Sequence, residues 1–164
     1  MKPVFYLLGA IALAILAIAG LQYLNPPIAS SDSSAESGNV LLNASENSYD
    51  FGSISMARGP VTKRFEVRSV DGAVRIGRMY TSCMCTSAKL ILPSGSFGPF
   101  GMPGHGIIPR IGAILGRNET AFVDVTFDPS AHGPAGIGRI ERVVSLEAEN
   151  GAPLQLNIAA TVTP

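Results

Sequence analysis

Two cysteines, Cys83 and Cys85, are the only thiols of this 164-residue chain, and Met84 separates them. The chain also contains only two histidines, His105 and His132. Two thiolates and two imidazoles form the ligand set of a tetrahedral site for a soft metal ion. The sequence therefore identifies Cys83, Cys85, His105 and His132 as candidate ligands of copper or zinc, which these donor types prefer over magnesium or calcium.

Both histidines lie in segments rich in glycine and proline, where the chain turns. The thioethers of Met84 and Met102 supply further soft sulfur near the candidate ligands, although they are weaker candidates themselves. Their presence favours copper over zinc. Taken singly, each histidine is also explained as an exposed loop residue, and only its coincidence with the cysteines points to a metal.

The spacing of Cys83 and Cys85 leaves three chemical states open. In an extended strand the two Cα atoms would be about 6.6 Å apart, near the upper limit for a disulfide. A disulfide therefore requires a bend, whereas two thiolates bound to one metal at about 2.3 Å require less distortion. An exported domain sits in an oxidising space, which favours a structural disulfide. A disulfide, a pair of metal ligands and free thiols all remain open.

No pattern in the chain indicates an enzyme. Thiol redox chemistry usually employs Cys-x-x-Cys at a helix N-terminus, and here the spacing is shorter and no helix is expected. The chain lacks a phosphate-binding glycine motif and the G-x-S-x-G motif of serine hydrolases. Lys+Arg and Asp+Glu both number 12, which gives no basic excess for nucleic-acid binding. A thiol redox partner of the cell envelope remains a lesser alternative.

The first segment of the chain has the character of a membrane anchor. Residues 4–24 contain no charge, and a helix of 21 residues covers a hydrocarbon core of about 30 Å. Lys2 precedes the segment and acidic residues follow it, so the N-terminus is expected in the cytoplasm and the rest outside the cytoplasmic membrane. The alternative is a cleaved signal peptide, for which Ala17-Ile18-Ala19 resembles a cleavage site.

Three parts follow from this composition: a transmembrane anchor at 1–24, a flexible linker at 25–38 and a folded domain at 39–164. The linker is rich in Pro, Ser and Ala and shows no apolar period. In the domain, apolar residues alternate with polar ones, and turn signals such as Asp71-Gly72 separate the runs. This pattern predicts an all-β sandwich with strands near residues 61–69, 73–79, 121–127, 140–148 and 154–162.

One long segment, residues 94–118, interrupts the strand pattern. It holds seven glycines and three prolines, and a connection of this length is uncommon in a compact domain. Six large apolar side chains are too many for a free linker: Phe97, Phe100, Met102, Ile107, Ile108 and Ile111. We therefore expect a loop that folds back onto the sandwich.

Four blocks of the domain resemble a known bacterial family. The blocks are Tyr49-Asp50-Phe51-Gly52-Ser53-Ile54, a basic and hydrophobic strand, Thr81-Ser82-Cys83-Met84-Cys85-Thr86, and Val125-Thr126-Phe127-Asp128-Pro129. They are similar to a domain-of-unknown-function family with YDFG-I and S-C-x-C-T motifs, itself similar to Ig-like ASH/MSP/HYDIN-type sandwiches. The resemblance covers about residues 47–163. It implies a seven-stranded Ig-like sandwich in the cell envelope and no enzyme activity.

The chain departs from that family at two places. Met84 stands between the cysteines where the family usually has glycine, and the long segment at 94–118 replaces a short turn. The sequence thus favours a single-pass, membrane-anchored Ig-like module that binds or supports another protein. Its expected partners are the lipid bilayer, through residues 4–24, and an unidentified envelope protein. Soft-metal binding is the main alternative function.

Overall fold

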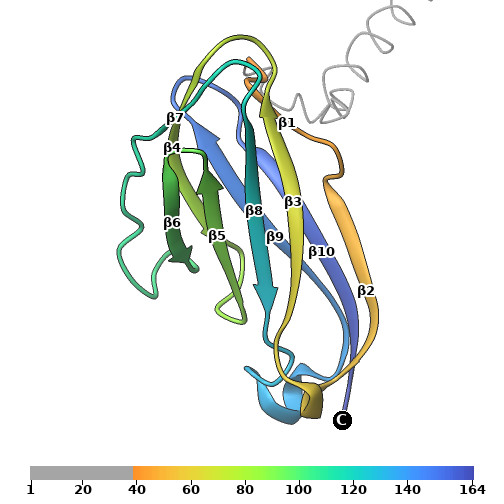
Figure 1. Cartoon of the computed structure of the whole chain (residues 1–164). Helices are drawn as coiled ribbons and strands as arrows, with labels where there is room; N and C mark the ends of the chain where they lie inside the picture. Colours follow the sequence, from red (N-terminus) through yellow and green to blue (C-terminus); the bar gives the residue numbers. More distant parts are fainter. Residues whose placement is uncertain (1–38) are drawn as a thin grey trace, which may run out of the picture. The chain divides into compact units, whose positions relative to one another are not determined.

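The computed structural model describes residues 39–164, which form a two-sheet β-sandwich (Figure 1). The expected anchor at 1–24 and linker at 25–38 lie outside the described residues. Within residues 39–164, no helix has the length and apolar character needed to cross a membrane. The prediction of an all-β domain is confirmed.

Each sheet has five strands (Figure 1). The first sheet has the order β1-β3-β8-β5-β6, with strands Leu42–Ala44, Val61–Ser69, Thr120–Phe127, Thr86–Leu92 and Gly95–Phe100. The second has the order β2-β10-β9-β4-β7, with strands Ser48–Ser55, Leu154–Thr163, Gly138–Ala148, Val74–Thr81 and Ile114–Leu115. Two short 3-10 helices, η1 (Met56–Arg58) and η2 (Gly133–Gly136), lie in connections.

The core lies between the sheets and contains the inward side chains that the alternation predicted. On β8 these are Ala121, Val123, Val125 and Phe127, and on β9 and β10 they are Ile140, Val144, Leu146, Ala148, Leu156, Ile158, Ala160 and Val162. Strand residues point alternately to opposite faces, so a period of two places one apolar face of each strand in the shared core. The five strands expected from this period are therefore confirmed.

Ten strands are present in the described residues, against the seven expected from the family resemblance. Two of the additional elements, β1 and β7, are only three and two residues long, too short for a period to be recognised. The expectation of a continuous loop at 94–118 is wrong in part. Its first residues form β6, which pairs with β5 through Leu90 and Phe97, and its end forms β7.

The Tyr49-Asp50-Phe51-Gly52 block has a structural role at the edge of the second sheet. β2 pairs in parallel with β10, and the register shifts between Ala159 and Thr161, which gives β2 an extra residue. The extra residue is accommodated by Gly52, whose φ of 70° is strained for other residues. The Gly52 N–H donates to Asp50 Oδ1 at 2.8 Å, and Arg139 donates to Oδ2 at 2.8 Å. These donors lower the pKa of Asp50, the Gly52 N–H most strongly.

This arrangement predicts how acid acts on stability. Because the pKa of Asp50 is lower in the folded chain than in the unfolded chain, its stabilising contribution is present above its ordinary value of 3.8 and is lost as the pH falls through the lowered value. The difference in Tm between the native chain and Asp50→Asn should therefore shrink as the pH falls below the ordinary value of 3.8. Asp71→Asn, at a carboxylate 91% exposed in the β3–β4 turn, is the control. An acid-independent Asp50 difference would contradict the prediction.

The irregular remainder of the long segment, residues 101–113, lies along β4 (Figure 1). Gly101 O accepts from Thr81 N at 3.1 Å, and the residues at the other end bond to Ile76 and Gly77 at 2.8–2.9 Å. Phe97, Phe100 and Ile111 pack against the core. The expectation that this segment folds back onto the sandwich is confirmed, although Ile107 at its tip is 93% exposed.

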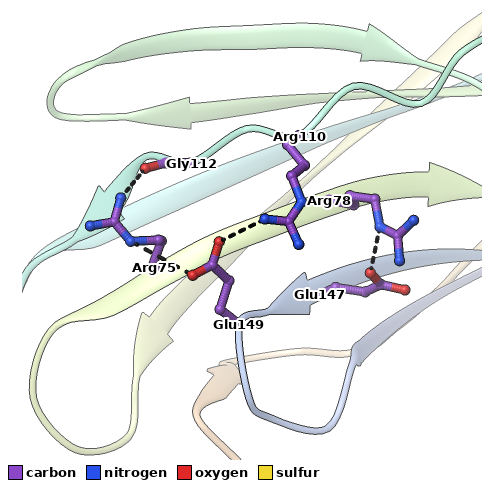
Figure 2. A network of polar contacts seen from close by, with 6 residues as sticks. All are labelled: Arg75, Arg78, Arg110, Gly112, Glu147 and Glu149. Atoms are coloured by element: carbon purple, nitrogen blue, oxygen red, sulfur yellow. Dashed lines mark hydrogen bonds and ion pairs between the residues drawn. The ribbon is translucent and has the colours of Figure 1, made fainter.

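Charged side chains fasten this loop to the outer face of β4 and β9 (Figure 2). Arg75 donates to Gly112 O at 2.7 Å and pairs with Glu149 at 3.8 Å. Arg110, from the loop itself, pairs with the other oxygen of Glu149 at 3.8 Å. The neighbouring pair of Arg78 and Glu147, at 3.0 Å, does not include the loop.

We therefore expect Arg75→Ala to release the loop more than Arg78→Ala. The Arg75 change removes a charged hydrogen bond to the loop backbone, and its cost should be about 1 kcal/mol because the side chain is half exposed. Amide hydrogen exchange of residues 101–113 should accelerate in Arg75→Ala and stay near the native rate in Arg78→Ala. Equal exchange in the two variants would show that the arginine does not hold the loop.

Candidate functional site

The cysteines lie in the connection between β4 and β5, at the end of the sandwich. A tight turn is closed by Thr86 N, which donates to Cys83 O at 3.1 Å. Ser82 fastens the turn to β9, because its N–H donates to Val143 O and its hydroxyl accepts from Val143 N, both at 2.9 Å. The sequence placed the motif at the end of a strand, and the structure shows that it joins two strands of different sheets.

Cys83 and Cys85 form a disulfide. The turn brings their Cα atoms to 5.3 Å, against the 6.6 Å of an extended chain, which supplies the bend that a disulfide at this spacing requires. Cys85 is 3% exposed, whereas Cys83 is only partly buried. Met84, between them, is 56% exposed. One sulfur of the pair therefore belongs to a residue near solvent and the other to a core residue.

His132 reaches the first sulfur from the connection between β8 and β9. Its Nε2 lies 3.2 Å from Cys83 Sγ, and its side chain is exposed. The two connections meet because β5 and β8 are paired, with Thr86 opposite Phe127, and Asp128 N donates to Cys85 O at 2.9 Å. Asp128 then turns the chain by accepting from Ser130 N at 2.8 Å. This turn directs the following residues, including His132, back toward the disulfide.

Arg142 of β9 reaches the second sulfur. Its Nε donates to Cys85 Sγ at 3.3 Å, and its Nη1 donates to Glu141 O at 2.8 Å. The sequence prediction did not include Arg142. A signal was present, because Arg142 occupies an inward position between Ile140 and Val144 on an otherwise apolar face. A charged residue at such a position needs a partner.

The buried Thr81 side chain holds the two ends of the cysteine turn together. It is 1% exposed, and its hydroxyl lies 3.0 Å from both Cys83 O and Thr86 O. A buried hydroxyl is stable only when it is hydrogen-bonded, and here it ties the start of the turn to its end. The Cys85 N–H adds a contact of 3.3 Å to Cys83 Sγ. The positions of both sulfurs are thus set by contacts from three segments: the β4–β5 turn itself, the β8–β9 connection and strand β9.

The structure brings together three of the four predicted metal ligands. The ligand atoms of Cys83, Cys85 and His132 all lie within 4.8 Å of one another. His105 is not in this group; it lies in the 101–113 loop, where its N–H donates to Met102 O at 3.3 Å. Because the two sulfurs are bonded to each other, the group can hold a metal ion only after the disulfide is reduced.

This disulfide contributes less to the free energy of unfolding than a bridge between distant residues would. A disulfide stabilises mainly by restricting the unfolded chain, and the effect grows with the number of residues enclosed. Here the bridge spans a sequence separation of two and joins no distant elements. The chain-entropy model gives a stabilisation of about 1.6 kcal/mol for so short a loop, against about 3 kcal/mol for a loop of 15 residues. Because this stabilisation is small, the contacts that surround the sulfurs matter for the reactivity of the disulfide as much as for the stability of the domain.

A second surface feature lies between β6 and the 101–113 loop. It is a cleft of about 530 Å³, lined largely by apolar and glycine residues together with Arg110, and Ile107 stands at its rim. A smaller cleft of about 300 Å³ lies between the loop and the face of β4 and β9. There, burial raises the pKa of Tyr80, and its hydrogen bond to Glu147 at 3.0 Å adds to the effect.

Comparison with known proteins supports the fold and no more. No protein-family profile and no curated protein matches the chain. A protein of unknown function from Porphyromonas gingivalis W83 is similar in structure, with a TM-score of 0.52 and 12% identity over 74% of this chain and 46% of that one. A family 123 glycoside hydrolase from Clostridium perfringens has a TM-score of 0.50 and 8% identity, over 71% of this chain and 22% of that one.

A human ASH/PapD-like domain of CEP192 is more distant, with a TM-score of 0.42 and 12% identity over 76% of this chain and 86% of that domain. The chain spans less than half of each of the first two structures. At these identities the likeness concerns the architecture of two packed β-sheets. Residues 39–164 therefore form an all-β domain of two packed sheets, and inferences about the role of this domain rest on its own residues.

Proposed function

We propose that this chain is a membrane-anchored, extracytoplasmic Ig-like module that binds an envelope protein and does not catalyse a reaction. The observation that carries the proposal is the cleft of about 530 Å³ between β6 and the 101–113 loop. Its lining combines apolar side chains with polar atoms, so together with the 93% exposed Ile107 it fits a partner segment that carries both apolar and polar groups. Arg110, whose side chain is 81% exposed, adds a positive charge that an acidic residue of that segment can meet.

Two features support the location. The uncharged run at residues 4–24 is long enough to span a bilayer, and Lys2 lies on its N-terminal side. The disulfide between Cys83 and Cys85 is a modification of oxidising compartments. Both are consistent with a domain that lies outside the cytoplasmic membrane.

The test places a photoreactive amino acid at position 107 of the full chain in cells. We expect one crosslinked protein at this position and none at Val70, which is 57% exposed in the β3–β4 turn and serves as the control. Arg110→Glu should abolish the crosslink by repelling the acidic group. External protease should digest the domain while the membrane is intact. A turnover activity lost in Cys83→Ser, or a domain protected from external protease, would contradict the proposal.

A second candidate function is the binding of a soft metal ion by Cys83, Cys85 and His132. The distance of 3.2 Å between Cys83 Sγ and His132 Nε2 favours it, because it places an imidazole nitrogen beside two sulfurs within the span of one metal ion. The test is the metal content of the chain prepared without oxygen in a reducing buffer. A reduced chain free of copper and zinc would remove this candidate.

A further inference from the structure

We propose that the end of the sandwich is a redox-gated Cu(I) site, in which Cys83, Cys85 and His132 are the ligands and Arg142 balances the charge. The inference rests on the second candidate function and adds the ion and its regulation. The disulfide is the closed state of the site, and the dithiol is the state that binds the ion.

The first step of the argument is distance. Two ligand atoms bound to one ion at about 2.3 Å are at most about 4.6 Å apart. The two sulfurs and the imidazole nitrogen already lie within 4.8 Å of one another, so a small displacement is sufficient. His132 is exposed and precedes Gly133, so its side chain has the freedom to follow the sulfurs when they separate. The site is therefore largely assembled before reduction.

The second step is charge. Two thiolates and a neutral imidazole around Cu(I) carry a net charge of −1, and around Zn(II) a net charge of zero. Cys85 is 3% exposed, and a net charge at a buried position is costly unless it is paired. The Arg142 guanidinium, whose Nε lies 3.3 Å from Cys85 Sγ, neutralises the Cu(I) form and leaves the Zn(II) form with an excess positive charge. The charge balance thus selects Cu(I).

The third step is the number of ligands. A structural zinc site takes four protein ligands, and in the part of the chain that the structure describes only three His, Cys or acidic ligands converge here. Soft thiolates bind both Cu(I) and Zn(II), and of these two ions Cu(I) is the one that is satisfied by three protein ligands. The Cys85 N–H, 3.3 Å from Cys83 Sγ, stabilises negative charge on the first sulfur as Arg142 does on the second. Each thiolate therefore has its own hydrogen-bond donor.

The site opens when the disulfide between Cys83 and Cys85 is reduced, which is a two-electron reaction. A thiolate of an exported dithiol protein attacks Cys83 Sγ, the sulfur of the less buried residue, and forms a mixed disulfide with it while the bond between Cys83 and Cys85 breaks. Cys85 leaves with the electron pair beside Arg142. The second thiol of the partner then releases Cys83, so the partner becomes a disulfide and this chain gains two electrons and two protons. Binding of Cu(I) displaces the two protons to solvent.

The experiment uses the full chain in detergent micelles without oxygen, in oxidised and reduced forms, with Cu(I) supplied from its coloured bicinchoninate complex. The reduced chain should remove one Cu(I) per chain from the chelator, and the oxidised chain none. His132→Ala should lower the affinity, whereas His105→Ala should not. Arg142→Gln should lower it by about 10–100-fold, as the loss of supporting contacts does at other metal sites. Arg139→Gln, on the same strand and bonded to Asp50, is the matched control.

The outcomes separate the inference from the function on which it rests. Equal binding by the oxidised and reduced chains would refute the gate while leaving metal binding intact. Tighter binding of Zn(II) than of Cu(I) would refute the choice of ion. An oxidised chain that exchanges its disulfide with dithiols, and whose reduced form holds no Cu(I), would overturn the whole proposal in favour of a thiol redox partner. Circular dichroism confirms that each variant is folded, and His132→Ala changes an exposed side chain.

Discussion

Replacement of Phe127 by alanine is expected to lower the free energy of unfolding by about 3–5 kcal/mol. Phe127 is 2% exposed and is among the largest fully buried side chains of the domain. It is the last residue of β8 and lies opposite Thr86 of β5, the residue that follows Cys85 in the chain. Its loss would leave a cavity beneath the Cys83–Cys85 turn. The site should therefore loosen along with the core.

Phe122→Ala is the matched control on the same strand. Phe122 is only partly buried, on the opposite face of β8, where the Arg64 guanidinium lies 5.4 Å from its ring centroid. Its removal should cost about 1 kcal/mol, from one cation–π contact and limited burial. Urea unfolding of both variants measures the difference. Equal costs would show that the end of the core near the cysteines is not tightly packed.

Thr81→Val is expected to lower the free energy of unfolding by about 1–3 kcal/mol. Valine has nearly the same shape, so the change removes the hydroxyl that contacts Cys83 O and Thr86 O and leaves little cavity. Because Thr81 is 1% exposed, water cannot replace the lost hydrogen bonds. The turn should also become more mobile, which hydrogen exchange of the Thr86 amide would report.

The control for this change is Thr126→Val. The Thr126 hydroxyl bonds to that of Thr62 at 2.8 Å on the outer face of the first sheet, where water reaches both groups. We expect it to cost less than about 0.5 kcal/mol. If the two threonine variants were equally stable, the buried hydroxyl would not be what holds the cysteine turn.

The alternation of apolar and polar residues was sufficient to predict the central strands. It is a local property, because the inward face of each strand is set by its own neighbours along the chain. The same period is present in β5, where Ala88, Leu90 and Leu92 are buried, but the prediction did not include this strand. The hairpin partner β6 could not be recognised in this way, because Gly95, Gly98 and Pro99 interrupt its pattern.

The candidate site was predicted in part. Residue types alone identified Cys83, Cys85, His105 and His132 as candidates. They did not show which of the two histidines lies beside the cysteines. Arg142 occupies an inward position of a predicted strand, where a polar side chain is a detectable departure from the pattern. Thr81 lies beyond the predicted strand at 73–79, and a register shift between Ile76 and Arg78 turns it inward, so the alternation gave no signal for it. The predicted anchor at 1–24 stays a prediction, since it lies outside the described residues.

The sequence by itself determined that residues 39–164 form an all-β domain, that the candidate ligands are sulfur and imidazole groups, and that a Cys-x-Cys disulfide needs a bend. Only the tertiary structure decided which histidine and which arginine reach the sulfurs. The reason is strand pairing: β5 pairs with β8 and β4 with β9. This pairing brings His132 and Arg142, 49 and 57 residues from their sulfur partners, to the same turn. His105 follows a different strand and is kept in another loop.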